Sequence, residues 1–123
     1  MEYNVSIVMS STRFTDIIND VKLFDDTIIM NCTDDTVLFT SESSDTGKIK
    51  VEMNETNMKE YTKNDDDINV SYALKLLSYA TLYNKITDEV KIDISDGVPL
   101  KITYILENSN SKLNLYLAPK IND

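Results

Sequence analysis

The residues of this chain whose spacing could do chemistry are its clustered carboxylates. Three aspartates are adjacent at 65–67, and acidic pairs stand at 25–26 and 34–35. A calcium loop needs acids at alternating positions together with a glycine, whereas adjacent side chains point in different directions. Acid runs in loops are usually only solvated. We therefore expect solvated turns at these places and no metal site.

The side chains that most often perform catalysis are missing. The 123 residues contain no histidine, one cysteine and two glycines, Gly47 and Gly97. The usual general base, the Ser/His and Cys/His nucleophile pairs and the glycine-rich phosphate loop are therefore absent. Carboxylate catalysis stays open, but no pattern points to it. The sequence predicts a protein that is not an enzyme and that needs no cofactor.

Charge argues against a simple nucleic-acid-coating protein. Lys and Arg number 12 against 21 Asp and Glu, which gives a net charge of -9. Coating proteins carry a basic face, and here the basic residues are scattered singly, with Arg13 as the single arginine. Any basic face must be assembled by folding. A length of 123 residues with 41% hydrophobic content suits one domain with a core.

The single cysteine bears on the cellular compartment. Cys32 excludes an internal disulfide framework, and its place in an alternating run predicts a thiol packed as a small apolar group. The first residues lack a signal-peptide pattern, and no apolar run approaches the roughly 18 residues of a membrane span. We therefore expect an intracellular protein that does not enter the membrane.

Hydrophobic periodicity predicts a strand-rich chain with two helices. A strand over 3–9 leads into a helix over 13–24, which Ser11 or Thr12 would cap, with Phe14, Ile17, Ile18, Val21 and Phe24 on one face. Further elements are expected in the order strand 27–32, strand 36–41, strand 47–53, strand 58–63, helix 71–84, and strands 87–95, 98–106 and 112–118.

This order reads as βαβββ twice, without sequence identity between the halves. The Asp96-Gly97 dipeptide between two alternating runs predicts a hairpin, and the polar stretch 108–111 predicts a looser one. About eight strands with two helices cannot form a doubly wound parallel sheet. The expected fold is α+β, with both helices on one side of antiparallel sheets.

The C-terminal stretch has two readings. Leu113, Leu115 and Leu117 alternate with polar neighbours, and Ala118-Pro119 then cannot continue a ladder. In the plain reading, Tyr116 and Ile121 complete the core and the proline merely ends a strand. In the functional reading, the segment is a fixed apolar lip at the surface.

The same stretch carries a family resemblance. The run 26–32 before Val37-Leu38-Phe39-Thr40, the segment 72–77, and the turn 96–100 followed by residues 115–121 stand in one order. This pattern resembles the C-terminal half of a DNA sliding clamp of the proliferating-cell-nuclear-antigen type. The resemblance covers nearly the whole chain and is most specific at 96–121. It favours one clamp domain over residues 1–123, with its two helices lining a central hole.

The resemblance implies three sites. Partner proteins with short motifs, DNA polymerase among them, would bind a pocket lined by Pro99, Tyr116, Ala118, Pro119, Lys120 and Ile121, pairing with the backbone near Lys120. The strand containing Gly47, Lys48, Ile49, Lys50 and Val51 would be the edge that pairs with a neighbouring subunit. Arg13, Lys75 and Lys85 would face duplex DNA, which a homotrimeric ring in the nucleus encircles without reading sequence.

Three differences from the family accompany this resemblance. The family's subunit has two domains, and this chain matches the second, so we expect only part of the partner pocket. The first helix presents Asp16, Asn19 and Asp20 where the family usually presents basic residues, and the stretch 43–46 near the subunit contact is polar. The alternative function is a stand-alone acidic domain that binds a protein or peptide and encircles nothing.

Overall fold

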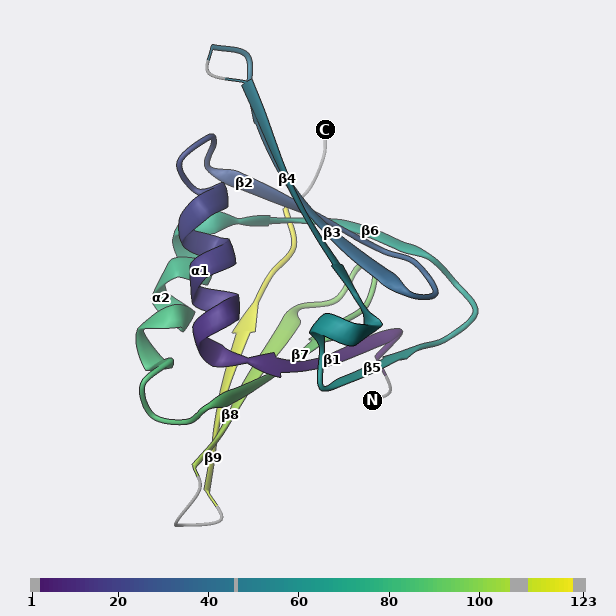
Figure 1. Ribbon diagram of the computed structural model, residues 1–123, viewed down its shortest axis with the longest axis vertical. Helices are drawn as coiled ribbons and strands as arrows, with labels where there is room; N and C mark the ends of the chain where they lie inside the picture. Colours follow the sequence, from purple (N-terminus) through teal and green to yellow (C-terminus); the bar gives the residue numbers. More distant parts are fainter. Residues whose placement is uncertain (1–2, 46, 107–110, 121–123) are drawn as a thin grey trace.

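The computed structural model describes residues 3–45, 47–106 and 111–120, and within them the chain forms nine strands and two α-helices (Figure 1). In chain order these are β1 (Val5–Ser10), α1 (Ser11–Val21), β2 (Thr27–Cys32), β3 (Thr36–Ser43), β4 (Gly47–Asn54), β5 (Glu60–Lys63), β6 (Ile68–Ala73), α2 (Leu74–Ala80), β7 (Glu89–Ile94), β8 (Leu100–Leu106) and β9 (Ser111–Leu117). Two 3-10 turns are η1 (Glu55–Asn57) and η2 (Thr81–Tyr83). Neither described helix is long and apolar enough to cross a membrane.

The strands form two antiparallel sheets, and each sheet mixes the two halves of the chain. One has the order β5-β1-β7-β8-β9 and the other the order β4-β3-β2-β6. The first strand of each half therefore pairs with a strand that follows the helix of the other half: β1 with β7, and β6 with β2. Neither half can complete its sheet alone.

Both helices lie on the same side of the sheets and contact each other (Figure 1). The apolar stripe of α1 is buried, as its spacing predicts, with Phe14, Ile17, Ile18 and Val21 at most 3% exposed. The inward residues of the strands, such as Ile28 and Ile102, complete the core. The predicted α+β class is confirmed.

The start of α1 differs from the prediction. The N-cap is Ser10, whose side chain accepts a hydrogen bond from the Arg13 backbone N–H at 3.2 Å, and not Ser11 or Thr12. Ser11 is already helical and buried, and its hydroxyl donates to the carbonyl of Thr87 at 2.6 Å. Strand β1 therefore runs into α1 without a loop, and the predicted helix begins two residues too late. It also ends three residues too late, because α1 ends at Val21 and Phe24 lies beyond it.

The second helix was predicted too long, because a strand was missed. Residues 71–73 belong to β6, and α2 spans only Leu74–Ala80 before η2 continues it to Tyr83. In β6 the alternating residues Ile68, Val70 and Tyr72 are buried. The second βαβββ unit therefore begins with β6. The strand predicted at 58–63 exists as β5, but it is an additional strand beside β1.

Both predicted hairpins are present. β7 and β8 pair antiparallel through a five-residue connection at 95–99, in which Gly97 has a φ of 76°. This positive φ is one that glycine adopts without strain. β8 and β9 pair from Leu106 opposite Ser111 onward, while the predicted turn residues 108–110 lie outside the described residues.

Two large tyrosines are fully buried in the core, and they differ in whether the hydroxyl has a hydrogen-bond partner. The Tyr104 hydroxyl donates to the Ala80 carbonyl at 3.0 Å, which ties β8 to the end of α2. Burial raises the Tyr104 pKa to about 12, so this donor stays protonated at neutral pH. The Tyr72 hydroxyl, by contrast, has no hydrogen-bond partner among the described residues.

This contrast gives a paired stability prediction. We expect Tyr104→Phe to destabilise the fold by about 1 kcal/mol, because Ala80 loses its side-chain donor, and to lower Tm by roughly 3–5 °C. Tyr72→Phe removes a hydroxyl that is buried without a partner, so its Tm should stay unchanged or rise. Thermal unfolding followed by circular dichroism measures both. A larger loss for Tyr72→Phe than for Tyr104→Phe would contradict the assignment.

Candidate functional site

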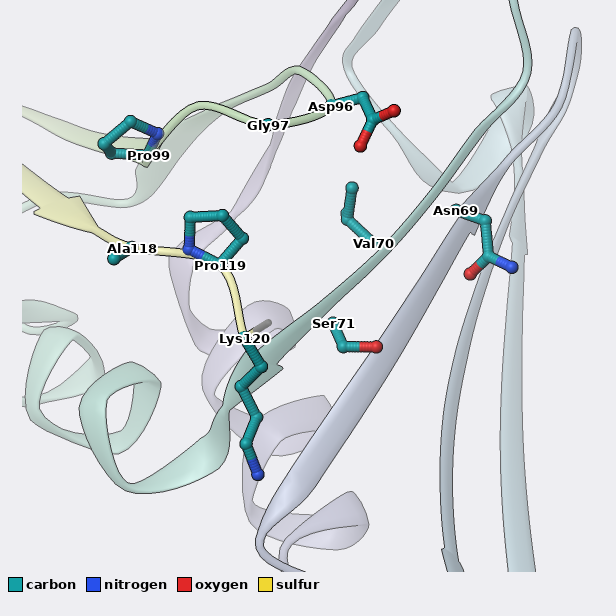
Figure 2. A pocket seen from close by; sticks show the side chains of 9 residues that line it. All are labelled: Asn69, Val70, Ser71, Asp96, Gly97, Pro99, Ala118, Pro119 and Lys120. Atoms are coloured by element: carbon teal, nitrogen blue, oxygen red, sulfur yellow. The ribbon is translucent and has the colours of Figure 1, made fainter. Parts of the chain in front are cut away.

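The C-terminal segment forms one wall of a surface pocket of about 490 Å³ (Figure 2). The pocket lies where three segments meet: the middle of β6, the β7–β8 connection, and the residues that follow β9. Its lining residues are Asn69, Val70, Ser71, Asp96, Gly97, Pro99, Ala118, Pro119 and Lys120. Four of the six residues predicted for the partner pocket are thus brought together here: Pro99, Ala118, Pro119 and Lys120.

The C-terminal segment is held in place by two hydrogen bonds. β9 ends at Leu117, opposite Leu100, because Pro119 cannot donate to a ladder. The chain then reaches β6 in the other sheet, where the Lys120 backbone N–H donates to the Ser71 carbonyl at 2.8 Å. The Lys120 ammonium donates to the Thr27 hydroxyl at 2.6 Å. The segment therefore bridges the two sheets, and the Lys120 amide is already paired within the chain.

Of the other two predicted pocket residues, only Tyr116 is described, and it does not line this pocket. Ile121 lies outside the described residues. Tyr116 is 59% exposed, and the Lys101 ammonium lies 6.0 Å from its ring centroid. It contributes instead to a separate apolar hollow between α2 and β9, together with Leu76, Tyr79, Ala80, Leu82, Tyr83, Leu115 and Leu117.

Sequence reasoning missed the pocket residues on β6 and around the turn: Asn69, Val70, Ser71, Asp96 and Gly97. The alternation of Ile68, Val70 and Tyr72 with polar residues was a strand signal that could have placed the β6 residues. No local pattern shows that β6 would meet the C-terminal segment, because that contact joins the two sheets.

β4, the strand predicted to pair with a neighbouring subunit, is an end strand of its sheet. It contains Gly47, Lys48, Ile49, Lys50 and Val51. Ile49 and Val51 pack against the core, while the two lysines are exposed, with the Lys48 ammonium 4.0 Å from the Glu42 carboxylate. Exposed charges on an edge strand hinder indiscriminate pairing.

The helix surface is poor in positive charge. Arg13, Lys75 and Lys85 are all exposed, as predicted, but only Lys85 lines the groove between the helices. Lys22, which follows α1 directly and was not predicted, also lines this groove. Leu82 is 73% exposed on the same surface. The surface therefore offers scattered cations among apolar and acidic side chains.

The remaining chemistry-bearing residues have structural surroundings. Burial raises the pKa of the Cys32 thiol to about 12, although Lys63 opposes the shift, so the unreactive thiol form prevails. Asp34 and Asp67, from two of the acidic turns, both pair with the Lys63 ammonium, at 2.9 and 3.0 Å. In the described part of the chain, no group of potential ligands could hold a metal ion.

Two βαβββ units with cross-paired strands, and both helices on one side, define the class of protein as a sliding-clamp domain. Comparison with known proteins narrows the class. The profile "Proliferating cell nuclear antigen, C-terminal domain" matches residues 1–120. The crystal structure of Proliferating Cellular Nuclear Antigen from Entamoeba histolytica superposes with a TM-score of 0.86 at 26% identity, covering 98% of this chain and 47% of that one. The chain therefore belongs to the proliferating cell nuclear antigen family.

Two curated relatives agree with this family assignment. Proliferating cell nuclear antigen 2 of Drosophila melanogaster is 28% identical over 99% of this chain and 48% of its own length. Proliferating cell nuclear antigen of Chaetomium thermophilum is 30% identical over 99% of this chain and 49% of its own length. The chain thus spans about half the length of the relatives it matches. Family membership also supports the expectation that it is not an enzyme.

The charge distribution on the helices generates a prediction for DNA binding. Each phosphate neutralised contributes about -0.9 to the slope of log affinity against log salt, and few cations are present. We expect no measurable affinity of this chain alone for short linear duplex DNA at about 0.15 M salt, by fluorescence anisotropy. If the chain binds the duplex at micromolar concentration and Lys75→Glu abolishes this binding, the helix surface binds DNA directly and the prediction is wrong.

Proposed function

We propose that this chain is a single clamp domain, residues 1–123, which acts as the C-terminal half of a DNA sliding-clamp subunit. The ring encircles duplex DNA in the nucleus and tethers DNA polymerase and other replication proteins to it. Enclosure holds the DNA, so base contacts are not needed. One observation carries the proposal: a clamp-domain fold, similar to a proliferating cell nuclear antigen structure over 98% of this chain, with both helices on one side.

Partner proteins bind, in this proposal, through short motifs whose apolar side chains enter the pocket beside Pro99, Ala118 and Pro119. Buried apolar anchors of this kind usually dominate the affinity of an interface. Tyr116, Lys120 and Ile121 complete the proposed site. Since the family's second wall comes from outside this half of the subunit, the domain alone should bind partners weakly.

Assembly depends, in this proposal, on the β4 edge. The residues Gly47 to Val51 would pair with a strand of the neighbouring subunit and continue the sheet around a trimeric ring. The alternative function, a stand-alone acidic interaction domain, is favoured by the net charge of -9 and the few cations on the helices. The two functions differ in whether the domain can enter a ring.

The oligomeric state of the chain tests whether the domain can enter a ring. We expect the 123-residue chain alone to be monomeric in multi-angle light scattering at micromolar concentration, because its neighbour at β4 is a domain that it does not contain. Joined to the N-terminal half of the Chaetomium thermophilum relative, it should form a closed trimer. A stable ring of the chain alone would contradict the first expectation, and a monomeric chimera that is folded would favour the alternative function.

A second prediction concerns the partner pocket. A synthetic peptide carrying a polymerase clamp-binding motif should shift the amide signals of Asp96, Gly97, Ala118 and Lys120, with weak affinity. We expect Ala118→Arg to weaken binding at least about tenfold by filling the exposed pocket mouth. Ser44→Arg, which adds the same charge at an exposed position remote from the pocket, serves as the control.

The Tyr116→Ala variant tests the outer part of the same site. Weaker binding would place the peptide across both the pocket and the hollow beside α2. Unchanged binding would remove Tyr116 from the site. Amide shifts that cluster elsewhere, with native affinity in Ala118→Arg, would rule out the pocket itself.

A further inference from the structure

The free edge of β6 is the part of the pocket that offers backbone hydrogen bonds. β6 is the end strand of its sheet, and its outer edge faces the pocket, across which lie the β7–β8 connection and the C-terminal segment. That segment covers the edge at Ser71. Figure 2 shows β6 passing along the pocket, with Asn69 further along the strand from this contact.

Two hydrogen bonds fix which backbone groups of β6 point outward. The Ser71 carbonyl accepts from Lys120, away from β2, whereas the Leu74 N–H donates to the Asp26 carbonyl, on the β2 side. Because the N–H and C=O of one strand residue point the same way and alternate along the strand, Asn69 shares the outward direction of Ser71. Both backbone groups of Asn69 therefore lie on the open edge.

The pocket suits an extended segment added at this edge. An antiparallel strand can exchange both backbone hydrogen bonds with Asn69, and its next side chain then turns to the face where Val70 lies. Val70 is 6% exposed and points across the pocket toward Asp96 (Figure 2). Pro99 and Pro119 add apolar surface beside it. An apolar side chain fits there.

The acidic residues around the pocket favour a basic side chain elsewhere in the added segment. Asp96 is exposed at the pocket and has no ion pair within the described residues, and Asp65 and Asp66 precede β6 as exposed acids. The one cation at the pocket, Lys120, lies at the Ser71 end, where its ammonium is bound to Thr27. Lys63 is already bound to Asp34 and Asp67, so a basic side chain near Asn69 meets Asp96 with no competing cation at that end of the described pocket lining.

We propose that the β6 edge at Asn69 binds, by strand addition, an extended segment of the partner that flanks its pocket-binding motif and carries a lysine or arginine. This inference rests on the proposed partner pocket. The partner segment pairs with Asn69 and not with the backbone N–H of Lys120, because that N–H already donates to the Ser71 carbonyl within the chain.

The test uses the full chain and a synthetic polymerase peptide with a lysine-containing flank. Asn69→Pro removes the outward N–H while leaving the ladder to β2 intact, because edge positions tolerate proline. Binding should weaken about two- to tenfold, the range for one hydrogen bond. Asn69→Val is the matched control, since it keeps the backbone group and should bind as the native chain does. The peptide should also slow hydrogen exchange at the Asn69 amide.

A second arm changes the peptide and leaves the protein unaltered. Methylation of flank amides, one at a time, should weaken binding at alternate residues only. Asp96→Asn should weaken the lysine-flank peptide about two- to fivefold and leave an alanine-flank peptide unchanged, as expected for an exposed ion pair. Asp16→Asn, which removes one exposed charge on α1, is the control and should change neither.

The outcomes separate the inference from the function on which it rests. If Asn69→Pro binds the peptide normally, every methylated peptide binds the native chain normally, and Ala118→Arg does not bind, the partner pocket is supported and strand addition at the β6 edge is contradicted. If Ala118→Arg also binds normally, the pocket itself is wrong. Slow exchange at Asn69 in the free chain would mean that the edge is already covered, by this chain or by a second copy, and would overturn the inference.

Discussion

The cross-pairing of the two halves is the constraint on which the rest of the structure depends. The first amide of each helix donates to the carbonyl just before the strand that follows the other helix: Ser11 to Asp88 at 2.9 Å, and Leu74 to Asp26 at 2.8 Å. These two equivalent bonds bring the helices side by side and set β1 against β7 and β6 against β2. The common helix surface and the open sheet edges follow from this exchange.

Periodicity predicted much of the fold, because its signals are local. The stripe of α1 and the alternation of β2 each depend on residues within a single element, and β2 was predicted with its observed bounds. Two of the boundaries that failed lie where a strand passes directly into a helix. At Ser10 and at Ala73 no turn residue separates the two periods, so the pattern was divided in the wrong place.

The candidate site was predictable only along its C-terminal wall. Pro99 and the segment 118–120 carry an unusual local sequence, whereas Asn69 and Ser71 resemble any polar residues of a strand. Their role depends on β6 being an end strand and on Lys120 crossing to it, and both are properties of the assembled sheets. Tyr116, which the same local sequence grouped with the pocket, lines the other hollow because it lies within β9 beside α2, before the chain crosses to β6 at Lys120.

The position of β1 has a consequence for synthesis on the ribosome. β1 lies between β5 and β7, so its second neighbour is not available until residue 94 has left the exit tunnel. Pairings this distant in sequence form slowly, and unpaired strands attract other chains in the meantime. Between the synthesis of β1 and that of β7 the nascent chain therefore carries an unfinished sheet, which makes early engagement by a chaperone an advantage for this topology.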